Sequence, residues 1–210
     1  MRILVIGATG GTGREIVKQA LERGHDVVAL ARTPGKLDLK HDRLRVVKGD
    51  VMDPSTLDAA VKDVDAVVCA LGHKRWLGPS NILSQGTRNI VAAMEKNGVK
   101  RLVVETALGV GDSIGRLGVY YTLFTIPFIL PFYWFDKERQ ERVVRASNVE
   151  WIIVRPAQLT NGRKRGTYKH GHRVGNYLWS LSISRADVAD FMLNQLGDTP
   201  YVRHAPGLCY

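Results

Sequence analysis

Apolar and polar positions alternate along the chain with two different spacings. Residues 2–6 (RILVI) form a short apolar run rich in β-branched residues, which is typical of a strand. After a glycine-rich turn, apolar residues recur at helical spacing over residues 14–23, and Gly24 marks the end of this helix. The N-terminal pattern therefore predicts a strand, a turn and a helix.

The same order of elements repeats to about residue 155. Strands are predicted at residues 26–31, 44–48, 66–71, 101–105 and 151–154, and helices at residues 54–61, 81–97, 136–147 and about 185–196. Nearly continuous apolar strands separated by helices are typical of a parallel sheet that is covered on both faces. We therefore predict an α/β fold in which helices flank a doubly wound parallel sheet.

The chain has 210 residues, which fit one compact domain, and its hydrophobic (45%) and charged (24%) proportions are those of a globular protein. We expect a single domain over residues 1–210. Its regular core spans about residues 1–155, and less regular loops at about residues 107–135 and 156–185 lie on the ligand side.

The two cysteines and the N-terminus indicate a compartment. Cys69 and Cys209 lie far apart in the sequence, and Cys69 falls in a run predicted to be a buried strand, so the two thiols suit a reducing environment. The apolar run at residues 2–6 is too short for the core of a signal peptide. We expect a cytoplasmic protein.

One apolar segment, residues 117–135, carries no charge and approaches the length of a membrane span. Pro127 and Pro131 argue against one continuous helix. We favour an apolar lid or pocket wall over a ligand. Contact with a membrane or a partner through residues 117–135 stays open but is not favoured.

The formal net charge of +10 attracts acidic ligands and phosphates, but it does not by itself indicate nucleic acid, and we expect no nucleic-acid partner. Residues 163–173 are basic and contain no acidic residue. They either attract the acid groups of a ligand or form a solvated loop. His170 and His172 lack a third ligand at metal-binding spacing, so we expect no metal site.

A glycine-rich turn, residues 7–13 (GATGGTG), follows the first strand and opens the first helix. In this context Gly7 permits the tight turn, Gly10 lets the backbone approach a pyrophosphate, and Gly13 allows close packing of helix on strand. The N-terminus of the helix presents free N–H groups to the anion. The turn predicts a dinucleotide site in a Rossmann-type fold.

The end of the second strand indicates which dinucleotide binds. NAD sites usually place an acidic residue there, whereas this chain has Arg32 and Thr33. The guanidinium of Arg32 can pair with a 2′-phosphate, and Lys36 either adds a second positive charge or lies in solvent. We therefore predict NADP(H) in preference to NAD(H).

Two further loops fit the same site. Asp50 could bond the adenine amino group or cap its own loop, and Asp53 is expected to cap the next helix. Small residues after the fourth strand would let the cofactor lie against the backbone. The residues expected to bind the cofactor are Gly7, Thr9, Gly10, Gly11, Thr12, Gly13, Arg32, Thr33, Lys36, Asp50, Val51, Ala70, Leu71, Gly72, Thr106 and Pro156.

Several segments together resemble the atypical short-chain dehydrogenases/reductases, an NAD(P)H-binding family, and most closely its biliverdin IXβ reductase/flavin reductase group. They are GATGGTG, KGDVMD, DAVVCALG, GTRNIVAAMEKNGVKRLVV and RASNVEWIIVRPAQLT, and the likeness covers about residues 2–160. The resemblance implies an NADPH-dependent reductase, often monomeric, that reduces a flat, aromatic or anionic small molecule such as a flavin or linear tetrapyrrole. FMN or FAD would then be a substrate and not a prosthetic group.

The chain departs from that group in two places. Ala107 stands where the flavin reductases carry a serine after the fifth strand, so any role of that hydroxyl is lost or passes to Thr106. A long apolar insert between Gly109 and Phe135 enlarges or covers the acceptor pocket. The acceptor could therefore differ.

Short-chain dehydrogenases commonly use a Ser or Thr, a Tyr and a Lys four residues later. Thr106, Tyr133 and Lys137 have this spacing and are the catalytic candidates. Tyr133 could instead pack in its aromatic cluster, and Lys137 could pair with Glu141 one helical turn on.

Two functions remain open. The first is an NADPH-dependent oxidoreductase that transfers hydride to a flavin, a quinone or a biliverdin-like tetrapyrrole. The second is a non-catalytic NADP-binding redox sensor or assembly factor, similar to NmrA-like proteins, which the absence of the family serine at Ala107 favours.

Overall fold

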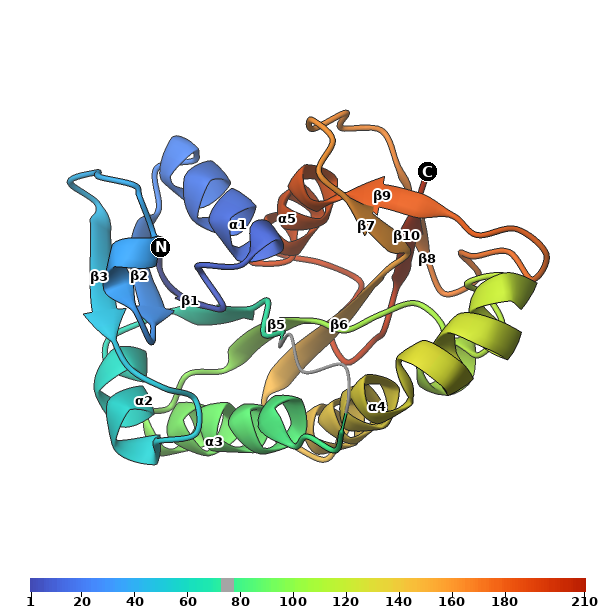
Figure 1. The fold of residues 1–210 in the computed structure, drawn as a ribbon. Helices are drawn as coiled ribbons and strands as arrows, with labels where there is room; N and C mark the ends of the chain where they lie inside the picture. The colour runs from blue at the N-terminus through green and yellow to red at the C-terminus, as the bar shows by residue number, and fades with distance from the viewer. Residues whose placement is uncertain (73–77) are drawn as a thin grey trace.

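The computed structural model describes residues 1–72 and 78–210, which form one eight-stranded sheet and a smaller two-stranded sheet (Figure 1). The order in the large sheet is β3-β2-β1-β4-β5-β6-β10-β8, and only β8 runs antiparallel to its neighbour. The strands are β1 (Arg2–Ile6), β2 (Asp26–Ala31), β3 (Leu44–Lys48), β4 (Ala66–Cys69), β5 (Arg101–Glu105), β6 (Glu150–Pro156), β8 (Lys169–Gly171) and β10 (Gly207–Cys209). The small sheet pairs β7 (Gln158–Thr160) with β9 (Ser182–Ser184).

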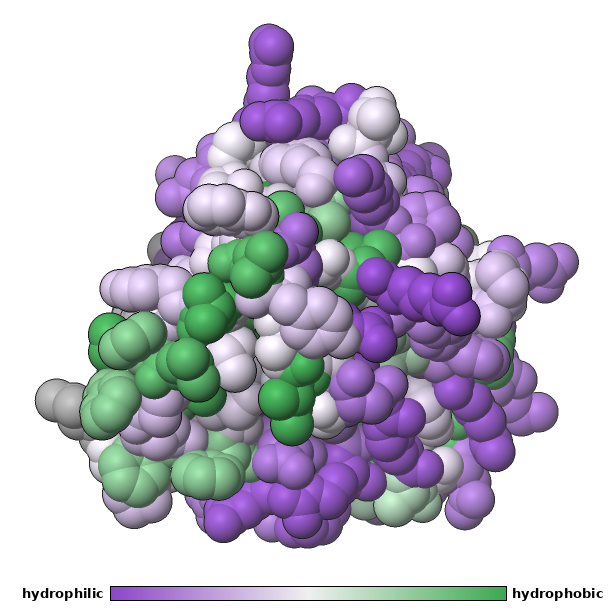
Figure 2. All heavy atoms as spheres, turned by 90° about the vertical axis from the view of Figure 1, so that its right-hand side faces the viewer, coloured by the Kyte–Doolittle hydropathy of each residue, from purple (hydrophilic) through white to green (hydrophobic). Residues whose placement is uncertain are grey.

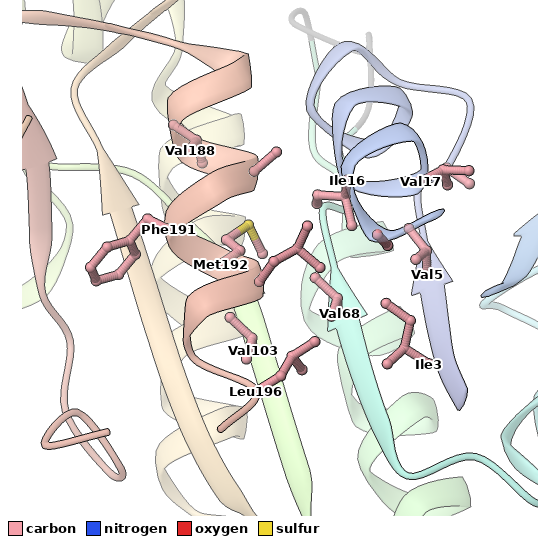
Figure 3. Close-up of a cluster of buried hydrophobic side chains, with 14 of the residues drawn as sticks. Ile3, Val5, Ile16, Val17, Val68, Val103, Val188, Phe191, Met192 and Leu196 are labelled. Atoms are coloured by element: carbon pink, nitrogen blue, oxygen red, sulfur yellow. The ribbon is translucent and has the colours of Figure 1, made fainter. Parts of the chain in front are cut away.

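Helices cover both faces of the large sheet (Figure 1). One face carries α1 (Gly11–Glu22) and α5 (Arg185–Asn194), and the other carries α2 (Pro54–Val61), α3 (Ile82–Lys96) and α4 (Pro131–Arg145). Residues on β1 alternate between the two cores, because successive side chains of a strand point to opposite faces. Ile3 and Val5 join the core under α1 and α5 (Figure 3), whereas Leu4 and Ile6 join the other. The predicted α/β fold with a doubly wound sheet is confirmed.

The strand order reverses at β1, which lies between β2 and β4. Connections from the two strands leave toward opposite faces of a doubly wound sheet, and a crevice opens beyond their carboxyl ends. The glycine-rich turn follows β1 directly, so the fold places residues 7–13 at this crevice.

Several element boundaries match the prediction, including those of β2, β3, β5 and α2. Two helices begin earlier than predicted. The helix α1 begins at Gly11 and not at residue 14. The helix α4 begins at Pro131 and not at residue 136, because proline fits the first turn of a helix. The strands β7 to β10 were not predicted, since each has only three residues and depends on distant partners.

The apolar segment 117–135 divides at Leu130 into two helical parts, and its role as a pocket wall stays a prediction. Residues Tyr121–Ile129 form a π-helix that contains Pro127, and the backbone turns at Leu130 before α4 begins. The prolines thus interrupt the segment as predicted, but many of its apolar side chains face solvent, with Phe128 79% exposed. Among the described residues, no helix is long and apolar enough to cross a membrane.

A buried ion pair joins α4 to β6. Arg155 donates from Nε to Oε1 of Glu141 over 2.9 Å and from Nη2 to Oε2 over 2.6 Å, and both side chains are almost fully buried. The sequence did not predict this pair, because Arg155 lies inside an otherwise apolar strand. This bidentate pair between the guanidinium and the carboxylate fixes the orientation of α4 on the sheet.

We predict that Glu141→Gln lowers the free energy of unfolding by about 3 kcal/mol, because it leaves the buried Arg155 guanidinium with only the exposed carboxylate of Asp112 as its ionic partner. Glu138→Gln is the matched control. Glu138 pairs with Arg142 at 3.6 Å on the surface, and its loss should cost less than about 1 kcal/mol. Urea unfolding measures both, and equal effects would contradict the prediction.

Candidate functional site

The glycine-rich turn brings three backbone segments into close contact. Gly7 has a φ of +78°, and a Cβ on it would lie 2.3 Å from the carbonyl oxygen of Ala70 after β4. A Cβ on Gly13 would lie 2.1 Å from the carbonyl oxygen of Gly7. Side chains are therefore excluded at both positions, as the roles predicted for these glycines require.

The N-terminus of α1 opens beside these contacts. Gly10 is its exposed N-cap residue and provides no capping side chain. The first N–H groups of a helix have no acceptor inside the helix and carry the positive end of its dipole. The residues present therefore fit an anionic group such as a pyrophosphate.

Basic residues gather where the ribose end of a dinucleotide is expected. Arg32 is exposed directly after β2, and Lys36 closes the short helical turn Pro34–Lys36. Arg14 connects this turn to the glycine-rich loop, since it donates from Nε to the Thr9 carbonyl over 3.1 Å and from Nη2 to the Lys36 carbonyl. Arg14 was not predicted, although its position directly after Gly13 is the signal that could have found it.

The loop after β3 is held by its own residues. Oδ1 of Asp50 accepts from the Met52 N–H over 3.1 Å, which is the loop-capping role that the sequence left open. Asp53 caps α2 by accepting from the Ser55 N–H over 3.0 Å, as predicted. The contact of Asp50 with adenine stays a prediction.

The loop after β4 passes close to α3 and α4. A Cβ on Gly86 of α3 would lie 2.7 Å from Val51 and 3.2 Å from Leu71, so this glycine lets the helix approach. A Cβ on Gly72 would lie 3.9 Å from the Tyr133 hydroxyl. The cofactor loop and the catalytic candidate Tyr133 therefore border the same space, and the loop's next residues, 73–77, lie outside the described residues.

The structure brings the three catalytic candidates together at the end of β5. Nζ of Lys137 donates to the Glu105 carbonyl over 3.0 Å and lies 5.7 Å from the centre of the Tyr133 ring. The Thr106 hydroxyl donates to Oε1 of Glu141 over 2.7 Å. Glu141 thus binds Thr106 and Arg155, while Lys137 binds the strand and does not take up the alternative pairing considered from the sequence.

Glu105 is a buried acid that sequence reasoning did not single out. Its Oε1 accepts from the Thr12 hydroxyl over 3.2 Å, which links β5 to the first turn of α1. Burial raises the pKa of the Glu105 carboxyl, and the Lys137 charge and the Thr12 hydrogen bond oppose this shift only in part. The only sequence signal was an acid at the end of an apolar strand.

Arg185 is a second residue that was not predicted. It begins α5, and its side chain lies over Gly11, where an added Cβ would be 2.6 Å from Cδ of Arg185. Nη1 of Arg185 donates to Oδ1 of Asn161 over 2.6 Å. The Arg185 guanidinium therefore lies beside the N-terminus of α1. It comes from α5, which packs on the same face of the sheet as α1.

The basic stretch 163–173 has structural contacts of its own. Lys164 pairs with Asp190 at 2.5 Å, and the Arg165 guanidinium lies 4.0 Å from the centre of the Tyr210 ring. Lys169 and Arg173 instead line a pocket of about 610 Å³ beside Cys209. Lys164 and Arg165 thus bind the fold, which neither interpretation of the sequence foresaw, and attraction of a ligand's acid groups by Lys169 and Arg173 stays a prediction.

Pro156 ends β6, and its carbonyl accepts from the Leu108 N–H over 2.9 Å. This bond ties the loop after β5 to the end of β6. The loops that carry Thr106 and Pro156 therefore form one wall beside the candidate catalytic residues.

Several known proteins are similar to this chain in sequence or in fold. The family described as NAD(P)H-binding matches residues 7–199. An uncharacterized chloroplastic protein of Arabidopsis thaliana is 31% identical over 208 residues, covering 93% of this chain and 71% of that protein. The photosystem II assembly factor Ycf39 of Synechocystis sp. is 38% identical over 106 residues, covering 49% of this chain and 32% of that protein.

A solved structure extends the comparison. The anaerobillin reductase ChuY of Escherichia coli O157:H7 superposes with a TM-score of 0.80 at 23% identity, covering 100% of this chain and 96% of that chain. This likeness shows the fold. The family match confirms the resemblance of the sequence motifs to an NAD(P)H-binding family.

We predict that the stability difference between the protein and its Glu105→Gln variant changes with pH. Because burial raises the pKa of Glu105, its contribution to stability is complete below the ordinary carboxyl pKa of 4.5 and is lost as pH rises through the folded-state value. Glutamine does not titrate and can still accept from Thr12. The variant should therefore gain stability relative to the original protein as pH rises from 4.5 toward neutral in urea unfolding; a difference independent of pH would contradict this.

Proposed function

The chain belongs to the NAD(P)H-binding family, and we propose that it is an NADPH-dependent reductase that transfers hydride to a flat aromatic acceptor. The acceptor class is a flavin, a quinone or a biliverdin-like tetrapyrrole, and FMN or FAD acts as a substrate. We further propose that the protein works as a cytoplasmic monomer. The observation that carries the proposal is the position of Glu105, which joins the first turn of α1 through Thr12 to the candidates Lys137 and Tyr133.

The preference for NADPH rests on the charges around the ribose end. Arg32 would pair with the 2′-phosphate, and Arg14 and Lys36 add positive charge at the same corner. No acidic residue directly follows β2, where an NAD site would need one to accept from the ribose hydroxyl. Paired charge-assisted bonds between a guanidinium and a phosphate are among the strongest polar contacts in proteins.

The chain's own residues would hold and orient the reactants. The N–H groups of α1 would bind the pyrophosphate, and Arg185, whose side chain lies over Gly11, would add positive charge beside the phosphates. Gly72, which has no side chain and lies near the Tyr133 hydroxyl, would let the cofactor approach Tyr133. NADPH supplies the hydride when it is bound, and proximity and orientation provide much of the rate.

Tyr133 is the proposed proton donor to the acceptor. Lys137 lies near its ring and is fixed by the Glu105 carbonyl, so it can orient the tyrosine and supply positive charge. The Thr106 hydroxyl donates its hydrogen bond to Glu141, so we assign Thr106 the task of shaping the site. An acceptor that takes its proton from solvent would not require Tyr133 as a proton donor.

The second candidate, a non-catalytic NADP-binding sensor or assembly factor, has two supports. Ala107 provides no hydroxyl, and that of Thr106 is occupied by Glu141. The likeness to Ycf39 is the other, although it covers a third of that protein. This candidate predicts binding of NADPH without turnover.

We predict that Arg32→Glu raises the dissociation constant of NADPH by roughly 10- to 100-fold and that of NADH by much less, because it removes the bonds to the 2′-phosphate. Arg139→Glu makes the same change of charge at an exposed position on α4 and should leave both constants unchanged. Fluorescence titration measures the four values. An unchanged ratio of NADPH to NADH affinity in Arg32→Glu would refute the assignment.

We predict that Tyr133→Phe lowers kcat by about 100-fold or more with little change in the KM for NADPH, because it removes the proton donor and keeps the ring. Tyr120→Phe removes a hydroxyl from an exposed tyrosine of the same segment and should have no effect. Retention of full activity by Tyr133→Phe would mean that this tyrosine only packs.

The reductase itself is tested by oxidation of NADPH, and separately NADH, with FMN, a quinone and biliverdin as acceptors. Loss of reduced-nicotinamide absorbance with NADPH and at least one acceptor is the expected result. Tight NADPH binding with no turnover on any acceptor would reject the reductase and favour the sensor.

A further inference from the structure

Large apolar side chains gather on one face of the molecule instead of in its core. They come from the π-helix and the segments around it and from the loop before β9, and we call them the apolar surface. Its members are Ile114, Val119, Tyr120, Leu123, Phe124, Phe128, Ile129, Phe132, Phe135, Tyr177, Leu178 and Trp179, each at least 42% exposed. Figure 2 shows hydrophobic residues gathered over one part of this face, with hydrophilic residues bordering them.

Backbone contacts join the two segments that form the apolar surface. The Asn176 N–H donates to the Arg116 carbonyl over 2.8 Å, and Leu117 and Asn176 form a β-bridge. A Cβ on Gly118 would lie 2.8 Å from the Trp179 carbonyl carbon. The surface is therefore built by tertiary structure and extends over two segments about 60 residues apart in sequence.

These exposed side chains do little to stabilise the fold. Phe128 is 79% exposed and Trp179 is 72% exposed, so neither contributes much to the two cores of the sheet. Tyr120 and Phe124 stack on each other with ring centres 6.1 Å apart, and both rings remain exposed. Apolar patches of this kind on a protein surface usually mark a binding surface.

Within the two segments that form the apolar surface, residues 114–135 and 161–180, the charged residues are all positive. Arg116 contacts the second segment through its backbone, and Lys169 and Arg173 line the adjoining pocket. The nearest acid before the first segment, Asp112, is paired with Arg155, and the acid that follows it, Asp136, is buried. Aromatic residues bordered by Lys and Arg are typical of elements that lie in a membrane interface, where cations meet lipid phosphates. A two-fold dimer through this face would instead bring like charges together.

We propose that the apolar surface docks on the headgroup region of an anionic lipid bilayer without crossing it. Phe128, Trp179 and their neighbours would enter the boundary between headgroups and acyl chains, while Arg116, Lys169 and Arg173 contact lipid phosphates. The docking does not depend on the proposed reductase activity, and each can fail without the other.

Cosedimentation tests the docking with vesicles of phosphatidylcholine alone and of phosphatidylcholine with phosphatidylglycerol. The protein should bind the anionic vesicles, and added salt should weaken this binding because it screens the cations. The double variant Phe128→Glu, Trp179→Glu should bind at least ~10-fold more weakly, since two aromatic contacts are replaced by negative charges. Both side chains are exposed, and urea unfolding should confirm that the variant keeps the original stability.

Met52→Glu is the matched control. Met52 is 41% exposed but lies in the loop after β3, outside the apolar surface, so this variant should bind the anionic vesicles like the original protein. Three results would overturn the proposal: equal binding to neutral and anionic vesicles, equal binding of the double variant, or absence of vesicle binding. Self-association that the double variant abolishes, without vesicle binding, would assign the surface to a second copy of the chain.

Discussion

The fold depends on a contact between backbones at the end of β1. Gly7 turns the chain through a φ of +78° beside the Ala70 carbonyl, and Gly13 packs α1 against the turn that it has just left. A single methyl group at either position would collide with a carbonyl oxygen at 2.3 Å or 2.1 Å. Because no side chain intervenes, the N-terminus of α1 lies at the point where the strand order reverses. The same packing that completes the sheet thus leaves free N–H groups that fit an anion.

The acceptor side depends on buried charge. Glu141 binds Arg155 of β6 and the Thr106 hydroxyl, Lys137 binds the backbone of β5, and the Glu105 carboxyl accepts from Thr12 of α1. These bonds connect α4 with two strands and with the cofactor helix. Buried charges are costly unless they are paired, so the cluster requires one arrangement of these elements. Because Tyr133 belongs to α4, that arrangement places its hydroxyl near Gly72.

Local patterns were sufficient to predict the strands of the core, the glycine-rich turn and the cap at Asp53, because each depends on neighbours in sequence. Contacts over long sequence distances could not be predicted. Arg185 reaches Gly11 from α5, Arg155 pairs across 14 residues, and the short strands after Pro156 exist only through their partners. The apolar composition of residues 117–135 did not indicate that side chains such as Phe128 face solvent, and the expected role of this segment as a lid or pocket wall stays a prediction.

A crystal structure with NADP⁺ tests the central claim most directly. In this crystal structure we expect the pyrophosphate at the N-terminus of α1, with Arg185 turned toward it, and the 2′-phosphate in contact with Arg32. An adenosine end bound elsewhere, or a 2′-phosphate without contact to Arg32 or Arg14, would contradict it.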